Sequence, residues 1–189
     1  MATFNEAFEG TSAHEGGYVN DPVDRGGETY RGIARVHHPE WTGWQRVDAL
    51  RGKRGFPNSL DRDTGLQQAV AAFYKDAYWD RFQGDALPDQ SVANELYDTA
   101  VNMGVRRAVR FLQSALNLLN RDQADYADLI VDGWFGDKTL ATVTTLLHED
   151  RSSDALVKLM NIQQGARYVE IMAGDSRQER FARGWIKRV

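Results

Sequence analysis

Apolar residues recur at intervals of three and four along most of the chain, and this spacing predicts α-helices. Near the N-terminus Phe4, Ala7 and Phe8 follow the spacing, and glycines 16–17 supply a helix stop. The pattern therefore predicts a first helix from about residue 4 to about residue 15. Glu15 would lie in its last turn.

The helical spacing continues from residue 63 almost to the C-terminus. Asp63 is suited to cap the first helix of this part, and Gly104 to end the second. In the acidic segment 120–136, which interrupts the pattern, Trp134 is expected to anchor a turn in the core. The helices expected here span 63–82, 88–103, 105–119, 137–148, 153–172 and 176–187.

Residues 18–32 read YVNDPVDRGGETYRG and show no helical period. Their glycines, proline, asparagine and aspartates favour a loop or a strongly turned β-hairpin. The chain contains no internal repeat, low-complexity tract or flexible linker. The fold class expected is mainly α, a helical bundle with one small β-hairpin, and 189 residues correspond to one domain or to two lobes of one domain.

The amino-acid composition and the absence of certain motifs exclude several kinds of covalent, metal-binding and catalytic chemistry. Because the chain has no cysteine, it cannot form disulfides, cysteine-ligated zinc sites or thiol nucleophiles. His37 and His38 are adjacent and so point in different directions on regular structure. With no H-E-x-x-H motif present, no bound metal is expected. The sequence also lacks a G-x-S-x-G elbow, which leaves acyl transfer unsupported.

The net charge of −4 argues against a dedicated nucleic-acid binder. Basic residues nevertheless cluster in 177–189 and in 106–110, either as solvated helix faces or as contacts for an anionic polymer. No apolar run approaches the ~18 residues of a membrane span. Residues 1–17 have no basic start, so we expect a chain made in the cytoplasm without an export signal and without stable membrane insertion.

Two carboxyl groups in contrasting surroundings, those of Glu15 and Asp24, are the candidate catalytic groups. The negative end of a helix dipole raises the pKa of a carboxyl placed where Glu15 is expected, as a general acid requires. Asp24 follows in a glycine-rich turn beside Arg25, whose charge favours the ionised form. Such pairs cleave glycosidic bonds. Spacing alone leaves open that Glu15 is an exposed helix-end acid and Asp24 a turn former.

The run EGGYVNDPVDRGGETYRGI at positions 15–33 closely resembles the signature of glycoside hydrolase family 108, lysozyme-superfamily muramidases of phages, prophages and bacteria. Segments 97–104, 131–139 and 181–189 resemble the C-terminal peptidoglycan-binding-type region of that family. The positions that fit the signature are Glu15, Gly16, Gly17, Tyr18, Asn20, Asp21, Pro22, Asp24, Gly26, Gly27, Thr29, Gly32 and Ile33.

The resemblance implies a lysozyme-like α+β fold, no cofactor, and Glu15 as the catalytic acid. The spacing of Glu15, Asp24 and Thr29 is also similar to the Glu–Asp–Thr triad of phage-type lysozymes, although the step from Asp24 to Thr29 is one residue shorter here. In that arrangement the aspartate and the threonine position a water on the far face of the sugar, which implies an inverting enzyme. Some relatives in the superfamily are retaining or use one carboxylate.

Candidate substrate-binding residues stand near Glu15, Asp24 and Thr29 in the sequence, and others follow downstream. Asn94, Tyr97, Asp98 and Asn102 share one helix face, which is either solvated or lines a sugar groove. Aromatic side chains can stack on sugars, although core packing is their commoner role. The aromatic candidates are Tyr18, Tyr30, Trp41 and Trp44. The residues expected to bind substrate are Tyr18, Asn20, Asp21, Arg25, Tyr30, Tyr97, Asp98 and Asn102.

Together these inferences predict a peptidoglycan hydrolase that cuts the β-1,4 bond between N-acetylmuramic acid and N-acetylglucosamine. Residues 1–92 would form the catalytic lobe and 93–189 a peptidoglycan-binding-like lobe, packed as one compact lysozyme-like domain. The protein would be a monomeric phage or prophage endolysin that reaches the periplasm and cell wall through a holin or an export system. The alternatives are a lytic transglycosylase and a non-catalytic peptidoglycan-binding or secretion accessory protein.

Overall fold

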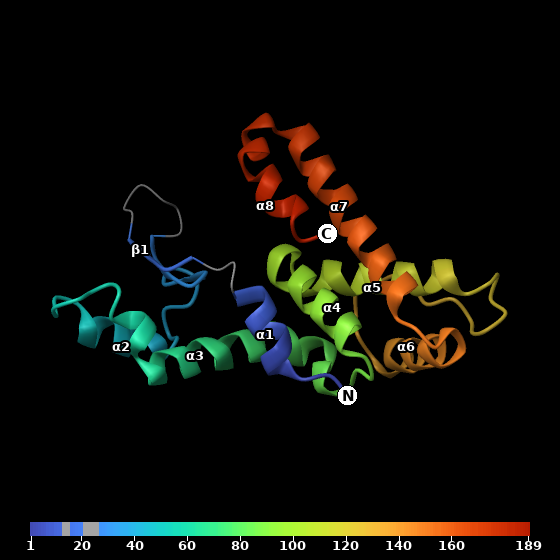
Figure 1. Ribbon diagram of the computed structural model, residues 1–189, viewed down its shortest axis with the longest axis horizontal. Coiled ribbons are helices and arrows are strands. Elements are labelled where there is room, and N and C mark those ends of the chain that lie inside the picture. Colours follow the sequence, from blue (N-terminus) through green and yellow to red (C-terminus); the bar gives the residue numbers. More distant parts are fainter. Residues whose placement is uncertain (13–15, 21–26) are drawn as a thin grey trace. The chain divides into compact units, whose positions relative to one another are not determined.

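The computed structural model describes residues 1–12, 16–20 and 27–189, which form two compact units. The sheet unit comprises residues 8–77, and the helical unit combines residues 1–7 with 78–189. Most of the described chain is helical, and one small antiparallel sheet accompanies the helices (Figure 1). The mainly α class predicted from the sequence is confirmed.

The sheet has three short antiparallel strands in the order β1-β2-β3. Tyr18 pairs with Tyr30, and Tyr30 pairs in turn with Ile33. Between the second and third strands, Gly32 has a φ of 75°, a left-handed conformation that glycine adopts readily. The β-hairpin predicted within residues 18–32 is therefore confirmed. The strands span Tyr18–Asn20, Glu28–Tyr30 and Ile33–Ala34.

Helices α2 and α3 complete the sheet unit. As predicted, Asp63 caps α3, because its carboxylate accepts a hydrogen bond of 2.7 Å from the backbone N–H of Leu66. Ile33, Val47 and Leu66 are fully buried and contribute to the core of this unit. The helices are α1 (Phe4–Ser12, which begins in the helical unit), α2 (Gly43–Leu50), η1 (Leu60–Arg62) and α3 (Thr64–Tyr74).

The prediction of a single α-helix over residues 63–82 is wrong for the second half of that range. After α3 the chain forms a π-helical turn, η2 (Lys75–Trp79), and a 3₁₀ turn, η3 (Asp80–Phe82). These changes of helix type accompany full burial of the Trp79 and Phe82 rings. Gly84 lies against the indole, since a Cβ there would be 2.2 Å from Trp79 Cε2. Apolar spacing indicates a helix but does not reveal such changes in its pitch.

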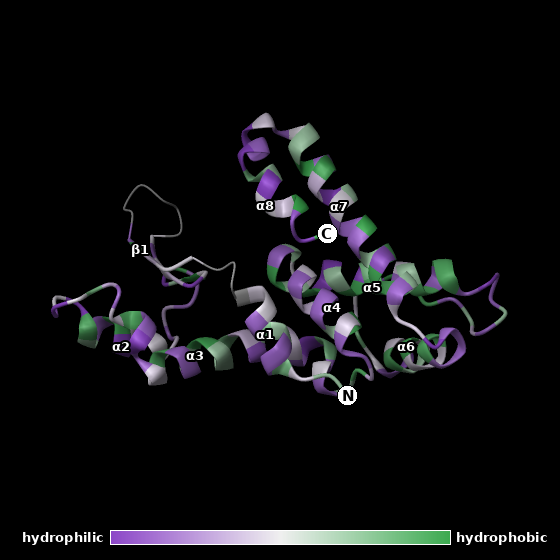
Figure 2. Ribbon diagram, viewed as in Figure 1, coloured by the Kyte–Doolittle hydropathy of each residue, from purple (hydrophilic) through white to green (hydrophobic). Residues whose placement is uncertain are grey.

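The helical unit is built on α4, α5 and α7, which contact one another and share the largest apolar core. Figure 2 shows apolar and polar residues alternating along α5, as expected for an amphipathic helix. Gly104, with a φ of 86°, separates α4 from α5 as predicted. The elements are η4 (Gly84–Ala86), α4 (Gln90–Met103), α5 (Val105–Leu119), α6 (Asp137–Asp150), α7 (Asp154–Gly174), η5 (Ser176–Phe181) and α8 (Ala182–Ile186).

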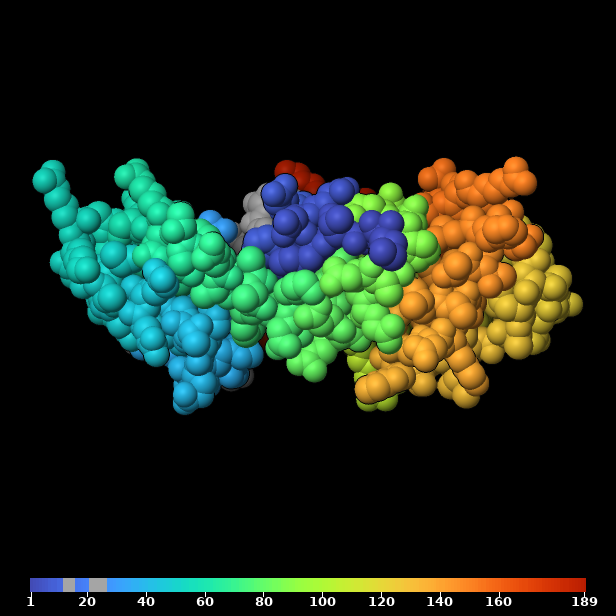
Figure 3. Space-filling model, turned by 90° about the horizontal axis from the view of Figure 1, so that it is seen from below, coloured from blue at the N-terminus to red at the C-terminus, as the bar shows by residue number. Residues whose placement is uncertain are grey.

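The N-terminal residues lie against the start of α4, within the helical unit (Figure 3). Ala2 donates its backbone N–H to Leu87 O at 2.9 Å, and Thr3 donates to the Gln90 side chain at 2.7 Å. At the other end of the chain, the one helix expected over 176–187 is replaced by the 3₁₀ segment η5 followed by α8.

The expected core position of Trp134 is wrong. Its side chain is 77% exposed, whereas the neighbouring Phe135 is 6% exposed and packs edge-on against Phe82, with the ring centroids 6.4 Å apart. Adjacent residues in an extended segment point to opposite sides, so only one of two neighbouring aromatic rings reaches the core.

Candidate active site

Four of the residues predicted to act in the site lie outside the described residues. They are Glu15, Asp21, Asp24 and Arg25. The described part of the predicted site is the three-stranded sheet, together with the helices of the sheet unit that pack against it.

The two faces of the sheet carry different side chains. Side chains alternate between faces along a strand, so Thr29 shares a face with its cross-strand partners Val19 and Ala34. Val19 is 50% exposed, which makes this the open face. The Thr29 hydroxyl lies 3.5 Å from the Gly27 carbonyl oxygen, a long hydrogen bond. Thr29 is thus positioned to present its hydroxyl on the open face.

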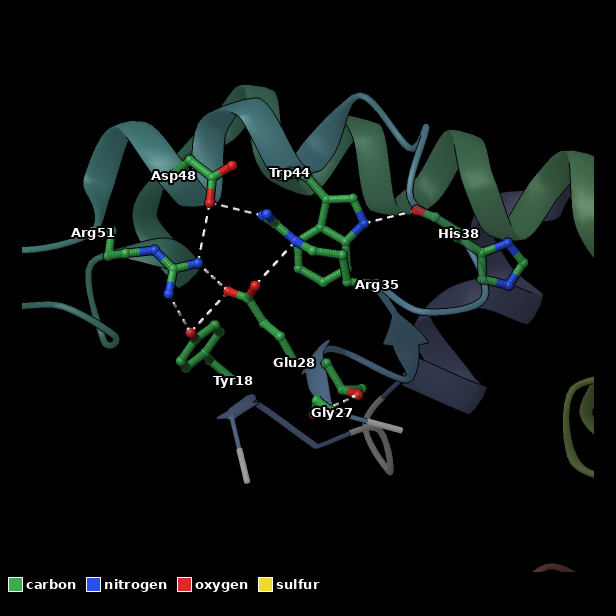
Figure 4. A network of polar contacts seen from close by, with 9 residues as sticks. Tyr18, Gly27, Glu28, Arg35, His38, Trp44, Asp48 and Arg51 are labelled. Carbon is green, nitrogen blue, oxygen red and sulfur yellow. Dashed lines mark hydrogen bonds and ion pairs between the residues drawn. The ribbon is translucent and has the colours of Figure 1, made fainter. Parts of the chain in front are cut away.

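The opposite face is braced by an ionic network centred on Glu28 (Figure 4). The Glu28 carboxylate pairs with Arg51 and with Arg35, whose Nε lies 3.0 Å from Oε2. Tyr18 donates its hydroxyl to Glu28 Oε1 at 2.9 Å. Asp48 of α2 accepts from Arg35 at 2.7 Å and from Arg51 at 3.1 Å. These bonds tie β1, β2 and the residue that follows β3 to α2.

The pKa shifts in this network are consistent with a structural role. The hydrogen bond from Arg35 is the largest cause that lowers the pKa of the Asp48 carboxyl. Burial, followed by the contact with Glu28, raises the pKa of the Tyr18 hydroxyl. Charge-assisted hydrogen bonds of this kind fix orientation. The network therefore holds the hairpin and Tyr18 in place, and Glu28 occupies a supporting position.

Tyr30, predicted to bind substrate, points into the sheet unit and is 1% exposed. Its hydroxyl donates to Asp61 Oδ1 at 3.1 Å and accepts from Gln67 at 2.8 Å. Burial raises the pKa of this hydroxyl. Trp44 is also buried, with its indole N–H donated to the carbonyl of His38 at 2.8 Å. Both rings therefore belong to the core, whereas Tyr18 and Trp41 are half-buried and Asn20 is exposed.

The candidates on α4 belong to the helical unit. Tyr97 is fully buried, and its ring packs edge-on against Phe4 and Trp79, 5.9 and 6.0 Å away between centroids. Asp98 accepts hydrogen bonds from Asn102 at 3.2 Å and from Arg188 at 2.7 Å. The shared face predicted for Asp98 and Asn102 is confirmed, and Asp98 also links α4 to the C-terminal end of the chain.

One buried carboxyl was not anticipated. Glu95 of α4 is 9% exposed, accepts a hydrogen bond of 3.1 Å from Thr99, and also bonds Asn161 of α7. Burial raises the pKa of Glu95 to about 7. A signal existed in the sequence, because Glu95 stands at helical spacing between the apolar residues Val92 and Leu96. It lies in the core of the helical unit.

Among the described residues, no group of three or more histidine, aspartate or glutamate side chains is arranged to hold a metal ion. A search of the described helices for one long and apolar enough to cross a bilayer finds none.

A comparison of the chain with known protein families identifies the family to which it belongs. The family model described as Glycosyl hydrolase 108 matches residues 8–104, which contain the whole motif and the sheet unit. The chain belongs to the glycosyl hydrolase 108 family. This glycosyl hydrolase 108 protein also matches, over residues 107–189, a model described as Predicted Peptidoglycan domain. The resemblance inferred from the sequence is thereby confirmed.

Solved structures support the same assignment. The glycosyl hydrolase 108 protein is similar to the structure of Brucella abortus SagA, with 26% sequence identity and a TM-score of 0.57. The similarity covers 98% of this chain and 88% of that chain. A search of curated proteins found no significant match. The fold is mainly α and lysozyme-like, and the protein is a glycoside hydrolase. The match over residues 107–189 supports peptidoglycan as its partner.

Proposed function

We propose that the protein is a muramidase that hydrolyses the β-1,4 bond between N-acetylmuramic acid and N-acetylglucosamine, with Glu15 as the catalytic acid. The observation that carries the proposal is the motif at 15–33, which lies inside the residues matched by the family model. The described part of this motif includes a hairpin braced through Glu28. Thr29 on the open face of that hairpin supports the placement of a water there.

The proposed reaction is a single displacement. Glu15 gives its proton to the glycosidic oxygen as the bond from that oxygen to C1 of the sugar breaks. Asp24 accepts a proton from a water whose oxygen forms the new bond to C1 from the opposite face. Thr29 orients that water with its hydroxyl. The product has a reducing end of inverted configuration, and no cofactor takes part.

The proposed setting is a phage or prophage endolysin. The chain would be made in the cytoplasm, act as a monomer on peptidoglycan strands in the periplasm and cell wall, and reach them through a holin or an export system. Residues 1–92 would supply the catalytic lobe, and residues 93–189 the peptidoglycan-binding-like lobe.

Digestion of purified sacculi tests the proposal. We expect Glu15→Gln to lower the rate of release of soluble muropeptides by about 10²–10⁴-fold, because a general acid contributes that much. Asp24→Asn should also lose activity, and Thr29→Val should lose less. Glu9→Gln, an exposed glutamate on α1, is the matched control and should retain full activity. Mass spectrometry of the wild-type products should show reducing ends.

Other outcomes contradict specific parts of the proposal. Products with a 1,6-anhydro end would identify a lytic transglycosylase. Soluble products from Glu15→Gln at the wild-type rate would show that the acid is misassigned. Sacculus binding without any release of fragments by the wild type would identify a non-catalytic binding protein.

A further inference from the structure

The loop between α5 and α6 contains no helix or strand, yet it is fixed in place by amide side chains of α5 and of the residue that follows it. Gln113 and Asn117 are four residues apart and so lie on one face of α5, and Asn120 is the residue that directly follows the helix. Asn117 accepts from the backbone N–H of Leu129 and donates to its carbonyl, both at 2.8 Å. Asn120 makes the same pair of bonds to Tyr126, at 3.1 and 2.6 Å.

Gln113 holds the part of the loop that carries Trp134. The Gln113 side chain is 2% exposed; its oxygen accepts from Gly133 N at 2.9 Å, and its nitrogen donates to Trp134 O at 3.1 Å. Asp132 accepts from the Trp134 N–H at 2.8 Å. Gly133 has a φ of 79°, and a Cβ there would lie 2.4 Å from the carbonyl oxygen of Arg106. The backbone that presents the indole is therefore pre-organised.

The indole that this turn presents stands between two open hollows of about 760 and 600 Å³. Asp132 and Trp134 line both hollows. Trp134 is 77% exposed, and the nearby Ile130 is 82% exposed. Exposed apolar groups gathered at one place on a soluble protein mark an interaction site. The loop and α6, which form the larger hollow, lie side by side in Figures 1 and 3.

The two hollows differ in chemistry. The larger is rimmed by hydroxyl and charged side chains of the loop and α6, among them Asp128, Lys138 and Thr142. The charged residues that line the smaller hollow are Arg81, Arg106 and Asp132, so two guanidinium groups stand against one carboxylate and the excess positive charge favours anionic groups. A single aromatic platform with hydrogen-bonding groups on one side and guanidinium groups on the other suits a sugar strand that bears carboxylates.

We propose that Trp134 is the stacking platform of a second, non-catalytic saccharide site for peptidoglycan, built from the α5–α6 loop. One sugar ring of the strand stacks its C–H face on the indole. Its hydroxyl and acetamido groups bond in the larger hollow, and lactyl or stem-peptide carboxylates face Arg81 and Arg106. The identity of the ligand rests on the proposed function, since the strand bound here is the polymer cleaved at the catalytic site.

A glycan explains this surface better than a second copy of the chain does. A stable contact between proteins buries about 800 Å² on each partner and has a continuous apolar centre. Here the exposed large apolar side chains of the loop are Ile130, Val131 and Trp134, and charged side chains such as Asp132, Lys138 and Arg106 stand among the lining residues, so no continuous apolar centre of that size is present.

The test measures binding of the full-length Glu15→Gln protein to purified sacculi, so that the polymer stays intact. We expect Trp134→Ala to weaken sacculus binding by about tenfold, and Trp134→Phe to retain part of it. Leu118→Ala, which removes a 68% exposed side chain elsewhere on α5, is the matched control and should bind normally. Thermal unfolding should be unchanged in all these variants, because the replaced side chains are exposed.

Unchanged sacculus binding by Trp134→Ala would overturn the proposal. Loss of self-association in sedimentation, or loss of binding to phosphatidylglycerol vesicles, with sacculus binding intact would also overturn it, in favour of a second copy or a lipid surface. In the Glu15-intact protein, Trp134→Ala should still cleave soluble glycan fragments. Failure of the muramidase assignment would instead appear as activity retained by Glu15→Gln, whatever residue occupies position 134.

Discussion

Among single residues, Glu95 gives the helical unit a dependence on pH. Burial raises its pKa from the ordinary 4.5 to about 7. Between these pH values the folded protein keeps a proton that the unfolded chain has released. The free energy of unfolding therefore falls as pH rises through this window, by up to about 3 kcal/mol at 1.36 kcal/mol for each pH unit.

Glu95→Gln should remove this dependence. The amide is neutral at every pH and can still bond Thr99, so the variant should be more stable than the wild type at pH 8 by up to about 3 kcal/mol. At pH 4 the two proteins should be nearly equal. Urea unfolding at both pH values measures the difference. Glu179→Gln, on the exposed part of η5, is the control, and an equal pH dependence in wild type and Glu95→Gln would contradict the assignment.

The fate of individual aromatic rings was the least predictable feature of the sequence. Tyr30 and Trp44 were candidates for stacking on sugars and Tyr97 was expected to bind substrate, yet each ring is buried. Trp134 was expected to be the core anchor, and its neighbour Phe135 is the ring that is buried. Which neighbour faces inward depends on the backbone direction that Gly133 and Gln113 impose, and this is a tertiary contact.

Among the elements, α5 combines an apolar face for the core with an amide face for the loop. Its bounds were predicted because apolar residues at helical spacing define it throughout. The hairpin was also predictable, since turn residues and β-prone residues alternate there. By contrast, the ends of the helix expected over 63–82 depend on how Trp79 and Phe82 fill the core, which local spacing does not encode.

Replacing Gln113 should show how far this amide face supports the loop. Gln113→Leu removes the bonds to Gly133 and Trp134 and leaves their backbone groups without these partners. We expect the free energy of unfolding to fall by roughly 2–3 kcal/mol, as measured by urea titration. Gln68→Leu, at an exposed position of α3, is the control and should change stability little. A loss of similar size in both variants would contradict the supporting role.

At the scale of the whole molecule, the net negative charge of the protein disfavours its approach to the proposed substrate. The net charge is −4, and the cell wall is itself polyanionic, so long-range steering is unfavourable. Part of the basic C-terminal cluster is already neutralised, since Arg188 pairs with Asp98 and Arg177 with Asp175. Attraction to the wall is therefore left to close contacts, which salt screens less than long-range forces.

Association with sacculi should consequently become faster as salt is added. Raising NaCl from about 10 to about 150 mM shortens the screening length to about 8 Å, and we expect the initial binding rate of Glu15→Gln to rise about twofold or more. Binding to the uncharged β-1,4 tetramer of N-acetylglucosamine is the control and should not respond. A rate that falls with salt would show that the basic clusters dominate the approach.

The exposure of Trp134 also gives the protein an optical signal of its own. All five tryptophans are described, and of these Trp44 and Trp79 are buried, Trp41 and Trp185 half-buried, and Trp134 exposed. An indole in water fluoresces at longer wavelength than a buried one and is quenched first by a polar solute such as acrylamide. The emission that acrylamide removes first therefore comes mainly from the α5–α6 loop, so that loop can be followed in the native protein without an attached dye.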